Sequence, residues 1–188
     1  RVADYQRVAA TQWVEKVFGS YQYFRLWLVQ LVGSLGDWLG FLAIAAAATE
    51  LGGGTPETAV GFVFTARIIP GLFLAPLAGV LVDRWNRKKV MILCDLGRVA
   101  ILVLLPFATT VWHLVLASFA LEIFTLLWIP AKDSVVPSIV PEESLTTVNS
   151  LQMAATYGTV PIAASLFIFL GRFADKVETW PGAGSINA

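Results

Sequence analysis

Long runs of apolar residues, separated by short polar breaks, make up most of the chain. Five runs are close to the roughly 20 residues that a helix needs to cross a hydrocarbon core of about 30 Å. They lie at Leu26–Thr49, Ala59–Val82, Val90–Thr110, Trp112–Ile129 and Thr147–Leu170. Because an open strand or loop leaves its backbone polar groups without partners in lipid, each run is predicted to be a transmembrane helix.

The breaks between the apolar runs are short and contain turn residues. They are Gly52–Pro56, Asp83–Lys89, Thr109–Thr110 and Pro137–Ser144. Short links place consecutive helices side by side and antiparallel, so the predicted fold class is all-α, a polytopic membrane helix bundle.

The two ends of the chain flank this bundle, which occupies residues 23–170. Charged and apolar positions alternate in residues 1–22, which predicts a cytoplasmic amphipathic helix on the membrane surface. A partly ordered tail is an equally good interpretation of this segment. Residues 171–188 are predicted to be an extracytoplasmic linker toward a sixth span.

Lysine and arginine are distributed unevenly among the links. The N-terminal segment and the link after the second run are basic, whereas the link after the first run has no basic residue. Because cytoplasmic loops carry the excess of Lys and Arg, the N-terminus is predicted to be cytoplasmic, and the stretch Lys132–Glu143 to return to that side. The basic positions are Arg1, Arg7, Lys16, Arg25, Arg84, Arg87, Lys88 and Lys89.

Composition supports residence in a membrane and excludes several functions. Hydrophobic residues make up 57% of the chain and charged residues 14%, whereas an ordinary soluble domain is about 25% charged. The net charge is zero, so no overall field favours nucleic acid. The sequence contains no phosphate-binding loop, no paired metal ligands and no nucleophile elbow. We therefore expect no cofactor, no metal and no enzymatic activity.

The segment from Gly79 to Lys89 contains the most informative motif, a Gly four residues before Asp83 and then a basic cluster. Gly79 is expected to allow a close helix approach, and Asp83 to face a neighbouring helix end or cation. The basic cluster is expected to bind anionic headgroups. The cluster begins with Arg84, Arg87 and Lys88.

This segment resembles the signature between the second and third spans of the major facilitator superfamily. Asn86 stands where that family usually has a second Gly, and Asn also accepts left-handed backbone angles. In the family the loop is associated with a conformational latch. The resemblance therefore implies gating roles for the signature residues, which are Gly79, Asp83, Arg84, Arg87 and Lys88.

Further segments between residues 23 and 170 resemble a bacterial subgroup that includes siderophore and macrolide exporters. They are 23–27, 33–38, 67–71, 75–79, 94–98 and 129–134. The resemblance implies a secondary transporter of the bacterial cytoplasmic membrane. This chain would supply five helices of its six-helix N-terminal half and is therefore expected to be part of a longer chain. Its partners would be lipid, a small-molecule substrate and the remaining spans of the transporter or other membrane subunits, with no nucleic acid.

Charged residues within the apolar runs are candidate functional groups, because each costs about 2.5 to 3.5 kcal/mol at a helix centre on insertion scales. Asp37 and Glu122 lie near the middle of the first and fourth spans, and Arg67 lies roughly 12 Å below the outer end of the second. With Gln152 they are predicted to line a path for substrate or protons; the alternative is that they are paired structural charges.

Asp95 and Arg98 lie three residues apart in the third span. We expect these two to be partners of the basic loop in gating or anchoring.

Two functional hypotheses follow. The first is a transporter fragment whose full protein exports a small organic molecule by alternating access. The second is an accessory or structural membrane subunit with a transporter-like scaffold in a larger complex. A membrane enzyme is the least supported class, because no catalytic constellation accompanies the intramembrane charges.

Overall fold

The structure, a computed structural model, describes residues 13–178, and its side chains through residue 174. Its helices are α2 (Tyr21–Leu51), α3 (Pro56–Asp83), α4 (Arg87–Leu104), α5 (Val111–Ile139), α6 (Leu145–Tyr157) and α7 (Thr159–Glu178), with short 3-10 turns η1 (Leu105–Phe107) and η2 (Glu142–Ser144). Five helical stretches are long and apolar enough to cross a membrane, the last of them running from Glu142 through α6 and α7 to Ala174. The all-α membrane bundle is thus confirmed.

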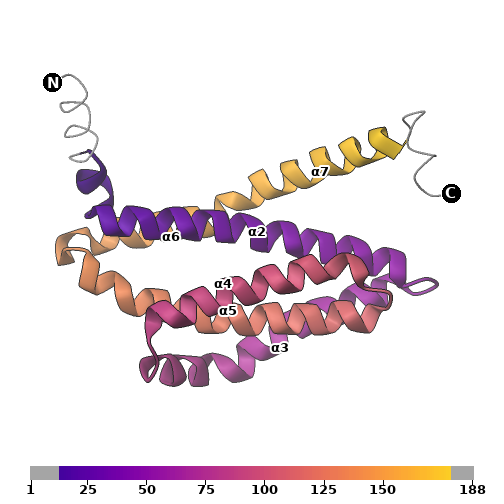
Figure 1. The fold of residues 1–188 in the computed structure, drawn as a ribbon, viewed down its shortest axis with the longest axis horizontal. Coiled ribbons are helices and arrows are strands. Elements are labelled where there is room, and N and C mark those ends of the chain that lie inside the picture. Colours follow the sequence, from indigo (N-terminus) through magenta and orange to yellow (C-terminus); the bar gives the residue numbers. More distant parts are fainter. Residues whose placement is uncertain (1–12, 179–188) are drawn as a thin grey trace.

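The helices α2 to α5 run alternately in opposite directions along the long axis of the bundle (Figure 1). The chain then turns back, and α6 lies alongside the first half of α2 and runs in the same direction as α2. The last helix, α7, continues from α6 and its far end tilts away from α2. This up-and-down arrangement agrees with the short links of the sequence.

Polar residues begin two of the helices. Ser20 Oγ accepts a hydrogen bond from the Tyr23 amide at 3.0 Å and caps α2. Asn86 Oδ1 accepts one from the Lys89 amide at 3.2 Å and caps α4. Asn86 has φ −71° and ψ 107°, so this position does not use the left-handed angles that Asn accepts. Asparagine is suitable at this position because its side chain satisfies a free amide at the helix start.

The fourth helix extends ten residues beyond its predicted end, because α5 ends at Ile139 and not at Ile129. Pro130 and Pro137 lie inside α5, where each removes one backbone donor without ending the helix. The expected cytoplasmic link from Lys132 onward is therefore wrong for its first part. Lys132 lies within α5 and is only 5% exposed.

The fifth span is broken into α6 and α7 at Gly158, whose amide donates to the Ala154 carbonyl at 2.9 Å. Pro161 follows the break, and because proline has no N–H the Tyr157 carbonyl loses its usual helical donor. The α7 helix continues to Glu178, so residues 171–178 are helical where a linker was predicted. Residues 179–188 lie outside the described part.

The N-terminal segment packs on the bundle from residue 13 onward. Residues 13–18 are helical, and Val14 and Phe18 are buried against Tyr23, Val136 and Val148. The Phe18 ring lies 5.2 Å from that of Trp27 in an edge arrangement. The part of the amphipathic prediction that concerns residues 1–12 lies outside the described residues.

Close helix approaches occur at Gly40 and Gly97, and not at the signature glycine. A Cβ on Gly40 would lie 2.7 Å from Leu102 of α4, and one on Gly97 would meet the ring of Phe124 of α5. At Gly79 no atom of another described helix lies within 4 Å of the place that an added Cβ would take. The close approach expected at Gly79 is therefore absent within the described residues.

Candidate functional site

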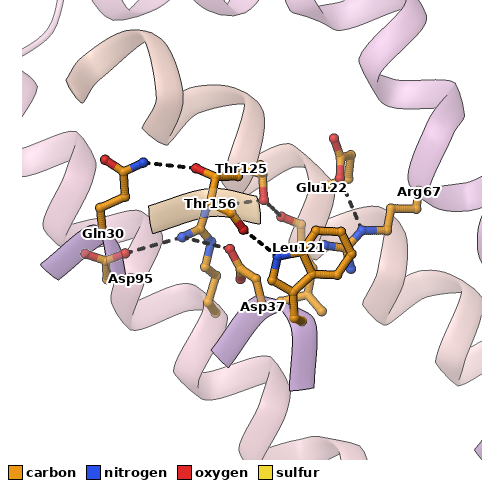
Figure 2. A network of polar contacts seen from close by, with 10 residues as sticks. Gln30, Asp37, Arg67, Asp95, Leu121, Glu122, Thr125 and Thr156 are labelled. Atoms are coloured by element: carbon orange, nitrogen blue, oxygen red, sulfur yellow. Dashed lines mark hydrogen bonds and ion pairs between the residues drawn. The ribbon is translucent and has the colours of Figure 1, made fainter. Parts of the chain in front are cut away.

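Polar side chains contact one another at three levels along the bundle. At the level nearest the α2–α3 turn, Arg67 Nε of α3 lies 3.6 Å from Glu122 Oε2 of α5 (Figure 2). The Arg67 guanidinium also lies 5.0 Å from the centre of the Phe41 ring of α2. Both charged side chains are largely buried, at 22% and 17% exposure. The two residues predicted separately therefore form one ion pair.

Arg98 of α4 occupies the next level, at the middle of the bundle. Its Nη1 lies 3.6 Å from Asp37 Oδ2 of α2 and 3.5 Å from Asp95 Oδ1 of its own helix. Its Nη2 donates to Thr125 Oγ1 of α5 at 3.2 Å, and Thr125 Oγ1 in turn donates to the Leu121 carbonyl at 3.0 Å. One guanidinium thus links three helices.

This placement of Arg98 differs from the expectation that it would be a partner of the basic loop. Arg98 is the twelfth residue of α4, so it lies about 16 Å along the helix from Arg87 at 1.5 Å per residue. At that depth its partners are the carboxylates of Asp37 and Asp95. A guanidinium that is only 7% exposed requires such partners, because an unpaired buried charge is very costly.

Lys132 of α5 forms the third level, nearest the basic loop. Its Nζ donates to Gln152 Oε1 of α6 at 2.9 Å and to Gln30 Oε1 of α2 at 3.5 Å, and lies 3.1 Å from Asp133 Oδ1. Gln30 Nε2 donates to Thr156 Oγ1 at 3.0 Å. Gln152, predicted as a path residue, therefore contacts a lysine on another helix.

Sequence analysis did not select Lys132 or Gln30 as site residues. A signal for Lys132 exists, because it lies seven residues after Thr125 and ten after Glu122, spacings that place all three on one face of α5. Because the span was predicted to end at Ile129, Lys132 was not considered as part of this helical face. Gln30 had no such signal in an apolar stretch of the first helix.

A cavity of about 330 Å³ lies beside the second and third levels. Its lining includes Asp37, Arg98, Trp128, Lys132, Asp133 and Gln152. Arg67 and Glu122 are not among its lining residues. The predicted path residues are therefore divided: Asp37 and Gln152 border this cavity, while Arg67 and Glu122 pair with each other beyond it.

The signature segment comprises the end of α3, the short turn of residues 84–86 and the start of α4. Arg87 Nη1 donates to the Ser134 carbonyl of α5 at 3.1 Å, which connects this turn to the end of α5. Asp83, Arg84 and Lys88 are exposed. Among the described residues, no ion pair includes Asp83.

Comparison with known proteins agrees with this arrangement. The model of the Major Facilitator Superfamily matches residues 26–188, and the chain belongs to this family. Together with the five apolar helices, this membership makes it a multi-pass protein of a lipid bilayer.

Several bacterial members of this family are similar to the chain. Macrolide efflux protein A of Streptococcus pyogenes is 30% identical over 155 residues, which cover 78% of this chain and 38% of that protein. Macrolide efflux protein A of Enterococcus faecalis is 36% identical over 108 residues, or 53% of this chain and 33% of that protein.

The uncharacterized MFS-type transporter YfiS of Bacillus subtilis is 29% identical over 113 residues, or 60% of this chain and 27% of that protein. The chain therefore spans between 27% and 38% of the length of these three relatives. No solved structure gives a significant match.

Proposed function

We propose that the full protein is a secondary active transporter that exports a small organic molecule by alternating access. One observation supports this function above the others: stacked buried charges beside a cavity in a five-helix membrane bundle. Such charges are costly in lipid and commonly mark the route of a substrate or ion. The substrate path is assigned to Asp37, Gln152 and the cavity around them.

The geometry supports separable roles for the charged levels. Arg98 is shared by Asp37 and Asp95 at 3.6 and 3.5 Å, so one carboxylate can turn to a substrate or a proton while the other keeps the guanidinium paired. The Arg67–Glu122 pair is assigned to the path beyond the cavity. Each carboxylate has a cationic partner when the cavity is empty, which allows the site to remain in the bilayer without substrate.

The signature residues are assigned to gating. The Arg87 hydrogen bond to Ser134 supports this role, because it connects the turn to the helix that carries Glu122 and Lys132. A movement of the turn would therefore be transmitted to α5. The exposed positions Asp83, Arg84 and Lys88 are available to the remaining spans or to lipid headgroups.

Export is the direction favoured by the relatives, because two of them are named macrolide efflux proteins. The same names favour transport over an accessory role in a larger complex, and over catalysis. We assign the protein to the bacterial cytoplasmic membrane. The N-terminus and the basic turn between α3 and α4 are assigned to the cytoplasmic side, because lysine and arginine are concentrated there.

Flux measurements test the proposed function. The full-length protein in proteoliposomes, with an imposed ion gradient, is expected to transport a radiolabelled macrolide faster than empty liposomes. Glu122→Gln is expected to lower the flux at least tenfold, whereas Glu57→Gln, at the exposed start of α3, is expected to leave it unchanged. No flux above that of empty liposomes would contradict macrolide transport. Equal flux in wild type and Glu122→Gln would remove Glu122 from the mechanism.

Cysteine labelling tests the orientation. In full-length protein with its native cysteines replaced, Gly54→Cys in the α2–α3 turn is expected to react with an impermeant maleimide added to intact cells. Lys88→Cys in the basic turn is expected to react only after the cells are opened. The opposite pattern would reverse the assigned orientation.

A further inference from the structure

The charged groups around the cavity are exposed to very different extents. The side chains of Arg98 and Lys132 are 9% and 6% exposed, whereas those of Asp37 and Asp133 are 26% and 52% exposed. All four residues line the same cavity. The carboxylates are therefore the charges that an incoming molecule can reach, and the cations lie behind them.

The two buried cations, Arg98 and Lys132, already have oxygen atoms as partners. Lys132 Nζ has three oxygen partners, on Gln30, Asp133 and Gln152. The terminal nitrogens of Arg98 have Asp37, Asp95 and the Thr125 hydroxyl as partners, while its buried Nε has no hydrogen-bond partner among the described residues. An anion entering the cavity would have to displace these oxygens and would meet exposed carboxylates first, which repel it.

The ratio of carboxylates to cations around the cavity also favours a positively charged ligand. Arg98 is shared by two carboxylates, those of Asp37 and Asp95, while Lys132 and Asp133 form a one-to-one pair. A buried charge excess in a low-dielectric site favours a compensating positive charge. Among the described residues, these groups comprise three carboxylates and two cations, so one further positive charge at the cavity would balance them.

Aromatic side chains provide the remaining part of the site. Trp128 and Tyr157 both line the cavity. The Trp128 ring already lies 5.7 Å from both the Arg98 guanidinium and Lys132 Nζ. Tyr157 is 62% exposed, and its ring is open to a ligand. An aromatic face is the usual contact of a protein-bound quaternary ammonium, and nearby carboxylates add Coulomb attraction.

We propose that this cavity binds the ammonium group of an organic cation, against the carboxylates of Asp37 and Asp133, with Tyr157 as its aromatic contact. Its place in transport rests on the proposed function, but binding itself does not. The cavity of about 330 Å³ is large enough for a small aryl-ammonium group. Asp37 supplies a carboxylate that shares Arg98 with Asp95, and Asp133 supplies the more exposed carboxylate.

A pair of probes of similar size and opposite charge tests the proposal on the wild-type protein. Equilibrium dialysis of the full-length protein in nonionic detergent would compare radiolabelled phenyltrimethylammonium with benzenesulfonate. The cation is expected to bind at least tenfold more tightly than the anion. A smaller preference, or no binding of the cation, would overturn the proposal.

Variants locate the site. Asp37→Asn and Asp133→Asn are each expected to weaken phenyltrimethylammonium binding at least tenfold, whereas Asp37→Glu retains the charge and is expected to retain the preference. Glu57→Gln is the matched control outside the cavity and is expected to change nothing. If Asp37→Asn does not fold, the affinity of Asp133→Asn, which changes an exposed side chain, tests the location of the site. Unchanged affinity in the Asn variants that fold would overturn the proposed site.

The dialysis and the flux assay can fail independently. A protein that binds the cation with the expected preference but shows no flux would contradict only the proposed function. A protein that transports a macrolide but shows no preference for the cationic probe would contradict only this inference.

Discussion

The contact of α2 with α6 and that of α3 with α5 use different chemistry. Side chains of α2 donate hydrogen bonds to backbone carbonyls of α6: Tyr23 to Val148 at 3.0 Å, Trp27 to Leu151 at 2.8 Å, Gln30 to Gln152 at 3.3 Å and Trp38 to Thr156 at 2.9 Å. The donors and acceptors ascend together along both helices. The two helices are therefore parallel and fixed in register by polar contacts.

The α3–α5 contact is mainly apolar. Buried Ala59 and Val63 of α3 pack with Leu114 and Leu121 of α5 in one cluster. Among the described residues, the ion pair between these helices is Arg67–Glu122. Small side chains on α3 allow the helices to approach closely, as is common where lipid provides no hydrophobic driving force for association.

The difference predicts how each contact fails. A carbonyl of α6 that loses its side-chain donor keeps its helical N–H partner, so the loss is small. A charge that loses its partner is left in a low-dielectric interior, so the loss is large. We therefore expect substitutions at the ion pairs to be more harmful than those at the α2–α6 hydrogen bonds.

The largest effect is expected for Arg98→Met, which leaves Asp37 and Asp95 without their cation. Removing one partner of a buried pair costs about 3 to 5 kcal/mol. Thermal unfolding of the full-length protein in detergent would show a large decrease in Tm, and adding Asp37→Asn would recover part of it. A Tm equal to that of wild type would show that these carboxylates do not depend on Arg98.

Glu122→Gln is expected to destabilise by about 1 to 3 kcal/mol, because it leaves the Arg67 charge without its carboxylate. The double variant with Arg67→Gln is expected to recover most of this loss in Tm. Flux separates the two interpretations of this pair. Low flux in a stable double variant indicates a role in transport, and wild-type flux indicates a structural pair only.

Gly97→Ala tests close packing on α5, because the added Cβ would meet the ring of Phe124. Overpacking of this kind typically costs about 1 to 3 kcal/mol. Gly61→Ala of α3 is the matched control, since no atom of another described helix lies within 4 Å of its added Cβ. The control is expected to leave Tm unchanged or raise it. Equal effects of the two substitutions would contradict the close approach at Gly97.

Trp27→Phe is expected to have the smallest effect, because it removes one hydrogen bond and keeps most of the ring. Interhelical hydrogen bonds in membranes are worth about 0.6 kcal/mol on average. Trp112→Phe, at 65% exposure, is the control for a tryptophan without such a bond. A decrease in Tm as large as that of Glu122→Gln would contradict the proposed ranking of the two contacts.

Sequence analysis located the five spans but not all of their ends. The predicted fourth span ends at Ile129 and the predicted link begins at Pro137, yet α5 continues through Pro130 and Pro137 to Ile139. Lys132 was consequently assigned to a link and its contacts with Gln30 and Gln152 were missed. The break at Gly158 was also missed, because its flanks are apolar enough to belong to one span.

The amino-acid sequence by itself determined that the chain is a membrane bundle of this family, because apolar run length and the Gly79–Lys89 motif are local properties. It also marked Asp37, Arg67 and Glu122 as unusual, since a charge in an apolar run is visible in one dimension. Only the tertiary structure decided the partners, which pair Arg98 with Asp37 and Arg67 with Glu122. Helical spacing gives the face of one helix, but these helices are apolar on nearly every side. The face that meets a given neighbour is therefore set by packing between helices, which no single segment encodes.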